Sequence, residues 1–125
     1  MQTILLALEF KHSIQTLVDK TLEFAQLLNA QIHLIHVQDE NNPDSKITEL
    51  KEIQDVFVGH DFKCTISEKS GDVIDVILSE AADIEASYII IGTRQHGRMH
   101  HLYFANAKEV LADLTPCPLL IVPHD

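Results

Sequence analysis

The sequence predicts an α/β fold, in which five parallel strands form one doubly wound sheet of order 3-2-1-4-5 with helices on both faces. Short apolar runs, typical of strands buried on both faces, alternate with segments whose apolar residues recur at helical spacing. No repeat, linker or low-complexity segment interrupts this alternation, which requires right-handed crossovers. With 46% hydrophobic residues, we expect residues 1–125 to form a single domain.

The start of the chain predicts two strands and a helix between them. Residues 3–8 (TILLAL) form a continuous apolar run, which indicates a buried first strand. Ser13 is suited to cap a helix whose apolar residues recur at spacings of three, four and seven. Asn29 is suited to end that helix in the left-handed conformation. Residues 32–37 (IHLIHV) then predict the second strand.

The middle of the chain continues the alternation. The polar segment 38–45 predicts a loop that ends at a helix cap. Apolar residues on one side of segment 47–57 predict the second helix. Residues 62–67 (FKCTIS) alternate, which predicts a less buried strand at a sheet edge. A Gly-Asp pair then opens a third helix over residues 73–84.

The end of the chain predicts the last two strands and a fourth helix. Residues 88–91 (YIII) indicate a short, wholly apolar strand, which we expect to end at Gly92. Apolar positions within segment 107–114 predict a helix that Pro116 stops. Residues 118–122 (PLLIV) predict the fifth strand.

The composition narrows the possible function classes. The formal net charge of −10 argues against a nucleic-acid partner, because contact with phosphates needs a basic face. No apolar run approaches the ~18 residues of a membrane span, and the first residues lack the basic start of a secretory signal. Cys64 and Cys117 are too few for a disulfide framework. We therefore expect a cytoplasmic protein with reduced thiols and no nucleic-acid or membrane partner.

The segment after the fourth strand is the strongest candidate for function. Residues 87–107 contain no acidic residue, and the only two arginines of the chain, Arg94 and Arg98, lie there. A strand that runs through a glycine loop into a helix offers free N–H groups and a helix dipole to an anion. Guanidinium groups suit phosphate oxygens. The alternative is that both arginines are solvated and only offset the acidic body of the protein.

The histidines allow a second interpretation, a metal site. His96, His100 and His101 lie close together in the loop, but no acidic residue is near them to orient their rings. We therefore expect loop or surface histidines and no metal. His33 and His36, within the second strand, are expected to be packed and hydrogen-bonded rather than catalytic.

The predicted topology places a ligand at the same loop. In open parallel sheets, ligands bind at the carboxyl ends of the strands where the strand order reverses. For the order 3-2-1-4-5, that point lies between the loops at residues 8–12 and 92–106. Glu9, beside it, would either bind a ribose hydroxyl or pair with a loop arginine. No set of nucleophile, base and orienting group is recognisable, nor a P-loop lysine motif, so we expect no enzymatic activity.

Four segments carry a family resemblance through their order and spacing: ILLALEF, IHLIHV, GDVIDVILSEAADIEASYIIIG and LTPCPLLIV. Along nearly its whole length the chain resembles the universal stress protein family. The resemblance implies a fold like that of the adenine nucleotide α hydrolases and a candidate ATP or AMP site. It places that site on the first, second and fourth strands and the following loop, at Ala7, Leu8, Glu9, Val37, Gly92, Thr93, Arg94, Gln95, Gly97, Arg98, Ala105, Asn106 and Ala107.

The ATP motif of that family is altered in this chain. Members that bind ATP carry Gly-x2-Gly-x9-Gly-Ser/Thr, of which Gly92 keeps the first position while Gln95, Ala105 and Asn106 occupy the others. Bulk at the second and third positions closes the backbone approach to phosphates. Glu9 also replaces the usual Asp. We therefore expect a non-enzymatic stress-response or regulatory protein with weak or no ATP binding. The alternatives are an ATP or AMP sensor with slow or no hydrolysis and, behind it, a hydrolase or transferase.

The last strand predicts a homodimer. It should lie at a sheet edge, and it carries no charged side chain. Monomers usually use charged residues at such an edge to prevent pairing with another strand. Isologous antiparallel pairing across a two-fold axis would cover it, and the family resemblance implies the same arrangement. The expected interface consists of Pro118, Leu119, Leu120, Ile121 and Val122.

Overall fold

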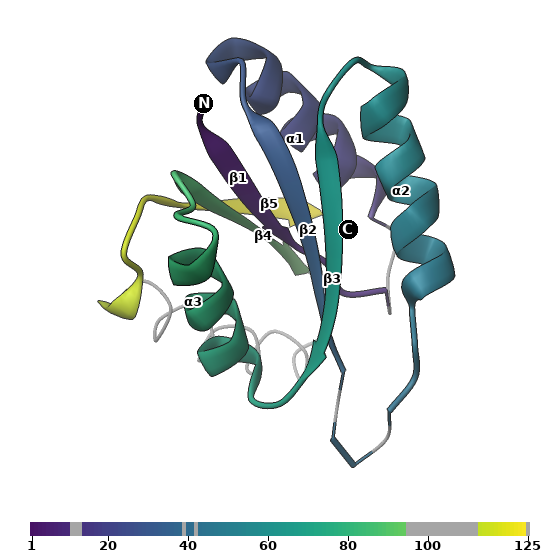
Figure 1. Ribbon diagram of the computed structural model, residues 1–125, viewed down its shortest axis with the longest axis vertical. Coiled ribbons are helices and arrows are strands. Elements are labelled where there is room, and N and C mark those ends of the chain that lie inside the picture. Colours follow the sequence, from purple (N-terminus) through teal and green to yellow (C-terminus); the bar gives the residue numbers. More distant parts are fainter. Residues whose placement is uncertain (11–13, 39, 42, 95–112, 125) are drawn as a thin grey trace.

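A single parallel sheet organises the chain in the computed structural model, which describes residues 1–10, 14–38, 40–41, 43–94 and 113–124 (Figure 1). The strand order is β3-β2-β1-β4-β5, and all four pairings are parallel, as the alternation predicts. The elements are β1 (Thr3–Ala7), α1 (Gln15–Leu28), β2 (Gln31–Gln38), α2 (Ile47–Gly59), β3 (Cys64–Ser70), α3 (Val73–Asp83), β4 (Tyr88–Arg94) and β5 (Leu119–His124).

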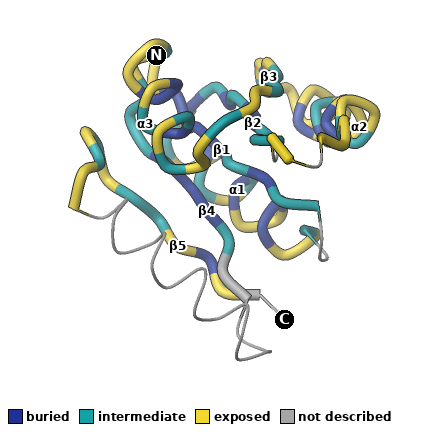
Figure 2. Tube along the Cα trace, turned by 90° about the horizontal axis from the view of Figure 1, so that it is seen from below, coloured by how far each residue is buried: buried dark blue, intermediate teal, exposed yellow. Residues whose placement is uncertain are grey.

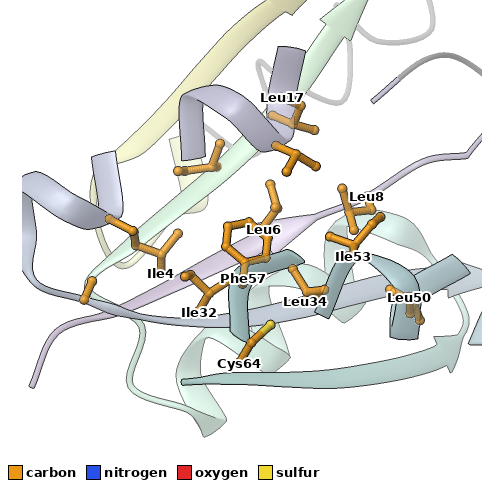
Figure 3. Close-up of a cluster of buried hydrophobic side chains, with 14 of the residues drawn as sticks. Ile4, Leu6, Leu8, Leu17, Ile32, Leu34, Leu50, Ile53, Phe57 and Cys64 are labelled. Atoms are coloured by element: carbon orange, nitrogen blue, oxygen red, sulfur yellow. The ribbon is translucent and has the colours of Figure 1, made fainter. Parts of the chain in front are cut away.

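Two hydrophobic clusters lie on opposite faces of the sheet. Ile4 and Leu6 of β1 pack in the cluster under α1 and α2, whereas Leu5 packs in the cluster under α3. All three are fully buried, because successive side chains of a strand point to opposite faces. Phe57 of α2 fills the centre of the larger cluster (Figure 3). Helices therefore cover both faces, which confirms the predicted layering.

The helix ends follow the sequence only in part. Asn29 adopts the left-handed conformation at the end of α1 (φ 52°), as expected. Asp72 caps α3 and accepts a hydrogen bond from the Asp75 backbone N–H at 3.0 Å. The cap expected at Ser13 is wrong in position: α1 begins at Gln15 with Ile14 at its N-cap and no side-chain cap bond. Ser13 itself lies outside the described residues.

Strand boundaries differ from the prediction where distant pairing sets them. β3 lies at a sheet edge, as expected, but it spans Cys64–Ser70 rather than residues 62–67. Phe62 instead follows the turn after α2, and its backbone N–H donates to the Phe57 carbonyl. β3 then continues until Ser70 pairs with Gln38 of β2.

The C-terminal part departs further. The fourth strand does not end at Ile91: β4 runs on to Arg94, because its last residues pair with Val122–His124 of β5. β5 correspondingly begins at Leu119 rather than Pro118. Of the fourth helix predicted within segment 107–114, the part up to residue 112 lies outside the described residues, and Asp113 and Leu114 are helical.

Candidate functional site

The carboxyl edge of the sheet opens between β1 and β4. The ladder between them ends at the Ala7–Ile91 pair. Beyond it, the Leu8 backbone N–H donates to the Ile35 carbonyl of β2 at 2.9 Å, whereas Gly92 pairs with Val122 of β5. The two central strands thus follow different neighbours after this point. This is the reversal of strand order at which open α/β sheets bind ligands.

The predicted site residues of the described chain surround this opening. Ala7 ends β1 and is half-buried, Leu8 is buried directly after it, and Glu9 follows half-buried. Val37, near the end of β2, packs against the α3-side cluster. The structure therefore brings the strand-borne part of the predicted set to one edge.

Three further residues of the set belong to a strand rather than to a loop. Gly92, Thr93 and Arg94 lie in β4, paired with Val122, Pro123 and His124. The expectation that the loop begins at Gly92 is therefore wrong, because β5 extends the ladder. The other predicted site residues lie outside the described residues: Gln95, Gly97, Arg98, Ala105, Asn106 and Ala107. The loop histidines His96, His100 and His101 lie outside them as well.

A hydrogen-bonded carboxylate braces the neighbouring strand ends. Glu68 of β3 accepts from His36 Nδ1 at 2.9 Å, from Ser45 Oγ at 2.8 Å and from the Lys46 backbone N–H at 2.6 Å. Phe10, which follows β1, contacts the His36 ring edge-on. Burial raises the pKa of Glu68, but these hydrogen bonds outweigh it and hold the pKa below its usual value. The sequence predicts a helix cap at the end of segment 38–45, but α2 begins after Lys46 with no side-chain cap of its own. The Glu68 carboxylate instead accepts the backbone N–H at the start of this helix.

A second network, on the α3 face, was not predicted. Glu80 of α3 accepts from His33 Nε2 of β2 and from Lys69 Nζ of β3, each at 2.6 Å. His33 Nδ1 lies 2.5 Å from the Thr65 hydroxyl. The side chains of Glu80 and His33 are only 5% and 12% exposed. The prediction that the strand histidines are packed and hydrogen-bonded is confirmed, but the charged partner of His33 was missed.

The fifth strand forms the second edge of the sheet, as predicted. Figure 2 shows β5 on the outside of the sheet, next to β4. Ile121 is 41% exposed, whereas Val122 is buried. Pro118 precedes the strand, and Leu119 and Leu120 are half-buried.

The cysteines behave as thiols, and the described chain shows no metal centre or membrane span. Cys64 and Cys117 are free, and burial raises the pKa of Cys64 to about 12. Within the described ranges, no three His, Cys, Asp or Glu side chains group as a metal site would require. No helix in the same part of the chain is long and apolar enough to cross a membrane.

Comparisons with known proteins show similarity to one protein family. The model of the universal stress protein family matches residues 49–123. No curated protein matches. Among solved structures, a universal stress protein from Archaeoglobus fulgidus has a TM-score of 0.75 at 21% identity; the match covers 98% of this chain and 44% of that one.

Two further structures match over most of both chains. A universal stress protein from Archaeoglobus fulgidus in complex with dAMP has a TM-score of 0.74 at 14% identity, with 98% of each chain covered. A family member from Arabidopsis thaliana with AMP bound has a TM-score of 0.75 at 17% identity, covering 100% of this chain and 93% of that one. At these identities, the structural likeness shows the fold. Because the family model matches more than half of the sequence, the chain belongs to the universal stress protein family.

Proposed function

We propose that this chain is a non-enzymatic, cytoplasmic stress-response or regulatory protein that works as a homodimer and binds adenine nucleotides weakly or not at all. The observation that carries the proposal is the divergence of β1 and β4 beyond Ala7 and Ile91, beside a motif that keeps only its first glycine. The topology supplies a place for a ligand, while the altered loop reduces what that place can hold.

The alternative function is an adenine nucleotide sensor. The solved structures with AMP and dAMP bound support it, because they share this fold. Gly92 keeps the first glycine of the family motif and lies at the divergence of β1 and β4. Both functions use the same edge of the sheet, and they differ in affinity.

The case for weak binding rests on two replaced glycines. Phosphates at such loops are held by backbone N–H groups, which requires close approach and often positive φ. Gln95 and Ala105 stand where the family motif has glycine. We expect a side chain at either position to obstruct that approach. We therefore expect any ATP dissociation constant to be weaker than about 10 μM, or less than ~7 kcal/mol of binding free energy.

Titration calorimetry with ATP and AMP, with and without Mg²⁺, tests this proposal. The unchanged protein should bind only above about 10 μM. The double variant Gln95→Gly with Ala105→Gly should bind ATP more tightly. A matched control, Gln2→Gly with Ala82→Gly, makes the same replacements at exposed positions away from this edge. It should leave the affinity for ATP unchanged.

Two outcomes would overturn the proposal. Sub-micromolar affinity of the unchanged protein for ATP or AMP would favour the sensor instead. Steady release of phosphate from ATP that is lost when Gly92 is replaced would show that the protein is an enzyme. If both double variants bind alike, the steric explanation of weak binding fails.

The proposed dimer rests on the position of β5 at the edge of the sheet. The Pro118 carbonyl accepts from the Ile89 backbone N–H at 3.0 Å, so the backbone groups of Pro118 face β4. Because backbone groups alternate in direction along a strand, those of Leu119 and Ile121 face away from β4. Pro123 has no N–H to offer. The edge therefore presents two backbone donors, at Leu119 and Ile121, to a second copy of the chain.

A proline at one of these donors tests the dimer. Ile121→Pro removes an outward N–H and leaves the bonds to β4 in place, which proline tolerates at an edge. Ile121→Val keeps the N–H and is the control. Light scattering should give twice the chain mass of 14.1 kDa for the unchanged protein and the control, and a shift toward 14.1 kDa for Ile121→Pro. A mass of 14.1 kDa for the unchanged protein at micromolar concentration would refute the dimer.

A further inference from the structure

A pocket of about 220 Å³ lies at the amino end of the sheet, away from the divergence of β1 and β4. It is lined by residues at the starts of β1, β2 and β3 and by the residue after α3: Thr3, Gln31, Ile32, His33, Lys63, Thr65 and Ile84. Its walls are mixed. Ile84 is the apolar side chain on this face, because the Ile32 side chain is buried in the cluster on the other face. Lys63, just before β3, and Thr65, in β3, are both exposed and lie two residues apart, on the same side of the strand.

Lys63 is the available cation of this pocket. Across the described residues, its ammonium has no ion pair or hydrogen bond, unlike Lys69, which is bound to Glu80. The side-chain amide of Gln31 is neutral, and one of its two N–H groups donates to the Thr3 hydroxyl at 2.8 Å. An anion that entered the pocket would therefore meet Lys63 and the Thr65 hydroxyl.

The protonation of His33 decides where the Thr65 proton points. Nε2 of His33 donates to the Glu80 carboxylate in both protonation states. When the ring is neutral, Nδ1 must accept, so the Thr65 O–H points at His33 and offers only lone pairs to a ligand. When the ring is protonated, Nδ1–H donates to the Thr65 oxygen, and the hydroxyl proton is free to turn to the ligand.

The surrounding charges complete this arrangement. Glu80 faces His33 from α3 and is shared with Lys69 of β3, which also lies in the field of Asp83. Lys63 lines the same pocket from the start of β3. Protonation of His33 adds one positive charge next to Lys63. Both effects, the new charge and the freed hydroxyl proton, favour an anion.

The order Thr65, His33, Glu80 resembles a nucleophile, base and orienting acid, but the backbone around the pocket favours binding over catalysis. An acyl-transfer site needs N–H donors for the developing oxyanion. The N–H groups of Gln31 and Ile32 donate instead to the carbonyls of Gln2 and Lys63, each at 2.9 Å. They are therefore not available as such donors.

We propose that this pocket binds a short-chain carboxylate, with its carboxylate on Lys63 and the Thr65 hydroxyl and its alkyl part against Ile84, and that protonation of His33 strengthens the binding. The site is independent of the nucleotide edge, so either can fail without the other. Reciprocity requires that the bound carboxylate in turn favours protonated His33.

An NMR titration with sodium propionate tests the proposal. Amide signals of His33, Lys63 and Thr65 should shift in a saturable way, with a dissociation constant of the order of millimolar. Binding should be at least about fivefold tighter near pH 6 than near pH 8, the range over which histidine changes its charge. Ionic strength is held constant with sodium chloride. Propionamide, which has the same shape without the charge, should not bind.

Variants separate the two contacts. Lys63→Gln should weaken binding at both pH values, and Thr65→Val should weaken it chiefly near pH 6, where the hydroxyl proton is free. Lys51→Gln, on the exposed side of α2, is the matched control and should bind propionate like the unchanged protein. The amide spectrum of each variant shows whether it is folded. Equal affinity at both pH values, equal shifts with propionamide, or no saturation by about 100 mM propionate, roughly a hundred times the expected dissociation constant, would overturn the proposal.

Discussion

Replacing Glu80 tests whether a buried carboxylate fastens α3 to the edge of the sheet. Its side chain is 5% exposed, and its two oxygens lie 2.6 Å from Lys69 Nζ and from His33 Nε2. Glu80→Ala removes both acceptors. Breaking a buried pair by removing one partner costs about 3–5 kcal/mol. Because the half-exposed Lys69 can return to water, we expect the lower end, about 3 kcal/mol of unfolding free energy.

Glu80→Gln isolates the charge from the hydrogen bonds. The amide oxygen can accept from Lys69, and the amide nitrogen can donate to His33 Nε2 if the ring changes tautomer. Nδ1–H of His33 then donates to Thr65. All three contacts survive, and only the charge is lost. We therefore expect a smaller cost of about 1–2 kcal/mol, in the range of one hydrogen bond to a charged group.

Urea unfolding followed by circular dichroism measures these differences. The control is Glu52→Gln, at an exposed position of α2, which should stay within about 0.5 kcal/mol of the unchanged protein. If Glu80→Ala costs less than about 1 kcal/mol, the network does not fasten α3, and the reasoning fails.

The pH dependence gives a second check. Burial raises the pKa of Glu80, but hydrogen bonds from Lys69, His33 and Ser67 outweigh it and hold the pKa below its usual value. A carboxyl with a lowered pKa contributes stability above its unfolded pKa of about 4.3 and loses it as the pH falls through the folded pKa. The gap between the unchanged protein and Glu80→Gln should therefore shrink below about pH 4. A constant gap from about pH 7 to about pH 3 would contradict the assignment.

Three further predictions follow from single residues. Asp72→Ala should lower the unfolding free energy by about 1 kcal/mol in urea, because α3 loses its cap, whereas Asp72→Asn should keep most of it. Phe57→Ala should cost about 3–5 kcal/mol in the same assay, because Phe57 is fully buried. Cys64, with its pKa raised to about 12, should react with a thiol reagent more slowly than the less buried Cys117, and unfolding should equalise the two rates.

The sequence predicts where the strands lie better than where they end. An apolar run such as YIII marks a strand that is buried on both faces, since local composition reflects local burial. The end of β4 depends on something else. Gly92 and Arg94 are in the strand only because they pair with Val122 and His124, far along the chain. No local sequence pattern indicates this distant pairing, so the loop was expected to begin at Gly92, before the end of β4.

The cap of α2 shows the same limit. Ser45 has the residue type and position of a helix cap, and its hydroxyl does lie 3.4 Å from the Ile47 backbone N–H. Its shorter contact is with Glu68, which also binds the Lys46 backbone N–H directly. A carboxylate from β3 thus serves the start of α2, and only the tertiary fold brings it there.

The position of the candidate site at the carboxyl edge of the sheet could be predicted, because the topology and the family motif both indicate it. The network around Glu80 is harder to predict, because it joins residues from three elements. Even so, the sequence contains a signal for it. Position 80 falls between Ile77 and Ala81, on the side of the predicted third helix that faces the core. A charge on that side needs a partner, because an unpaired buried charge is costly. His33, in the apolar second strand, is a polar group placed where α3 must pack.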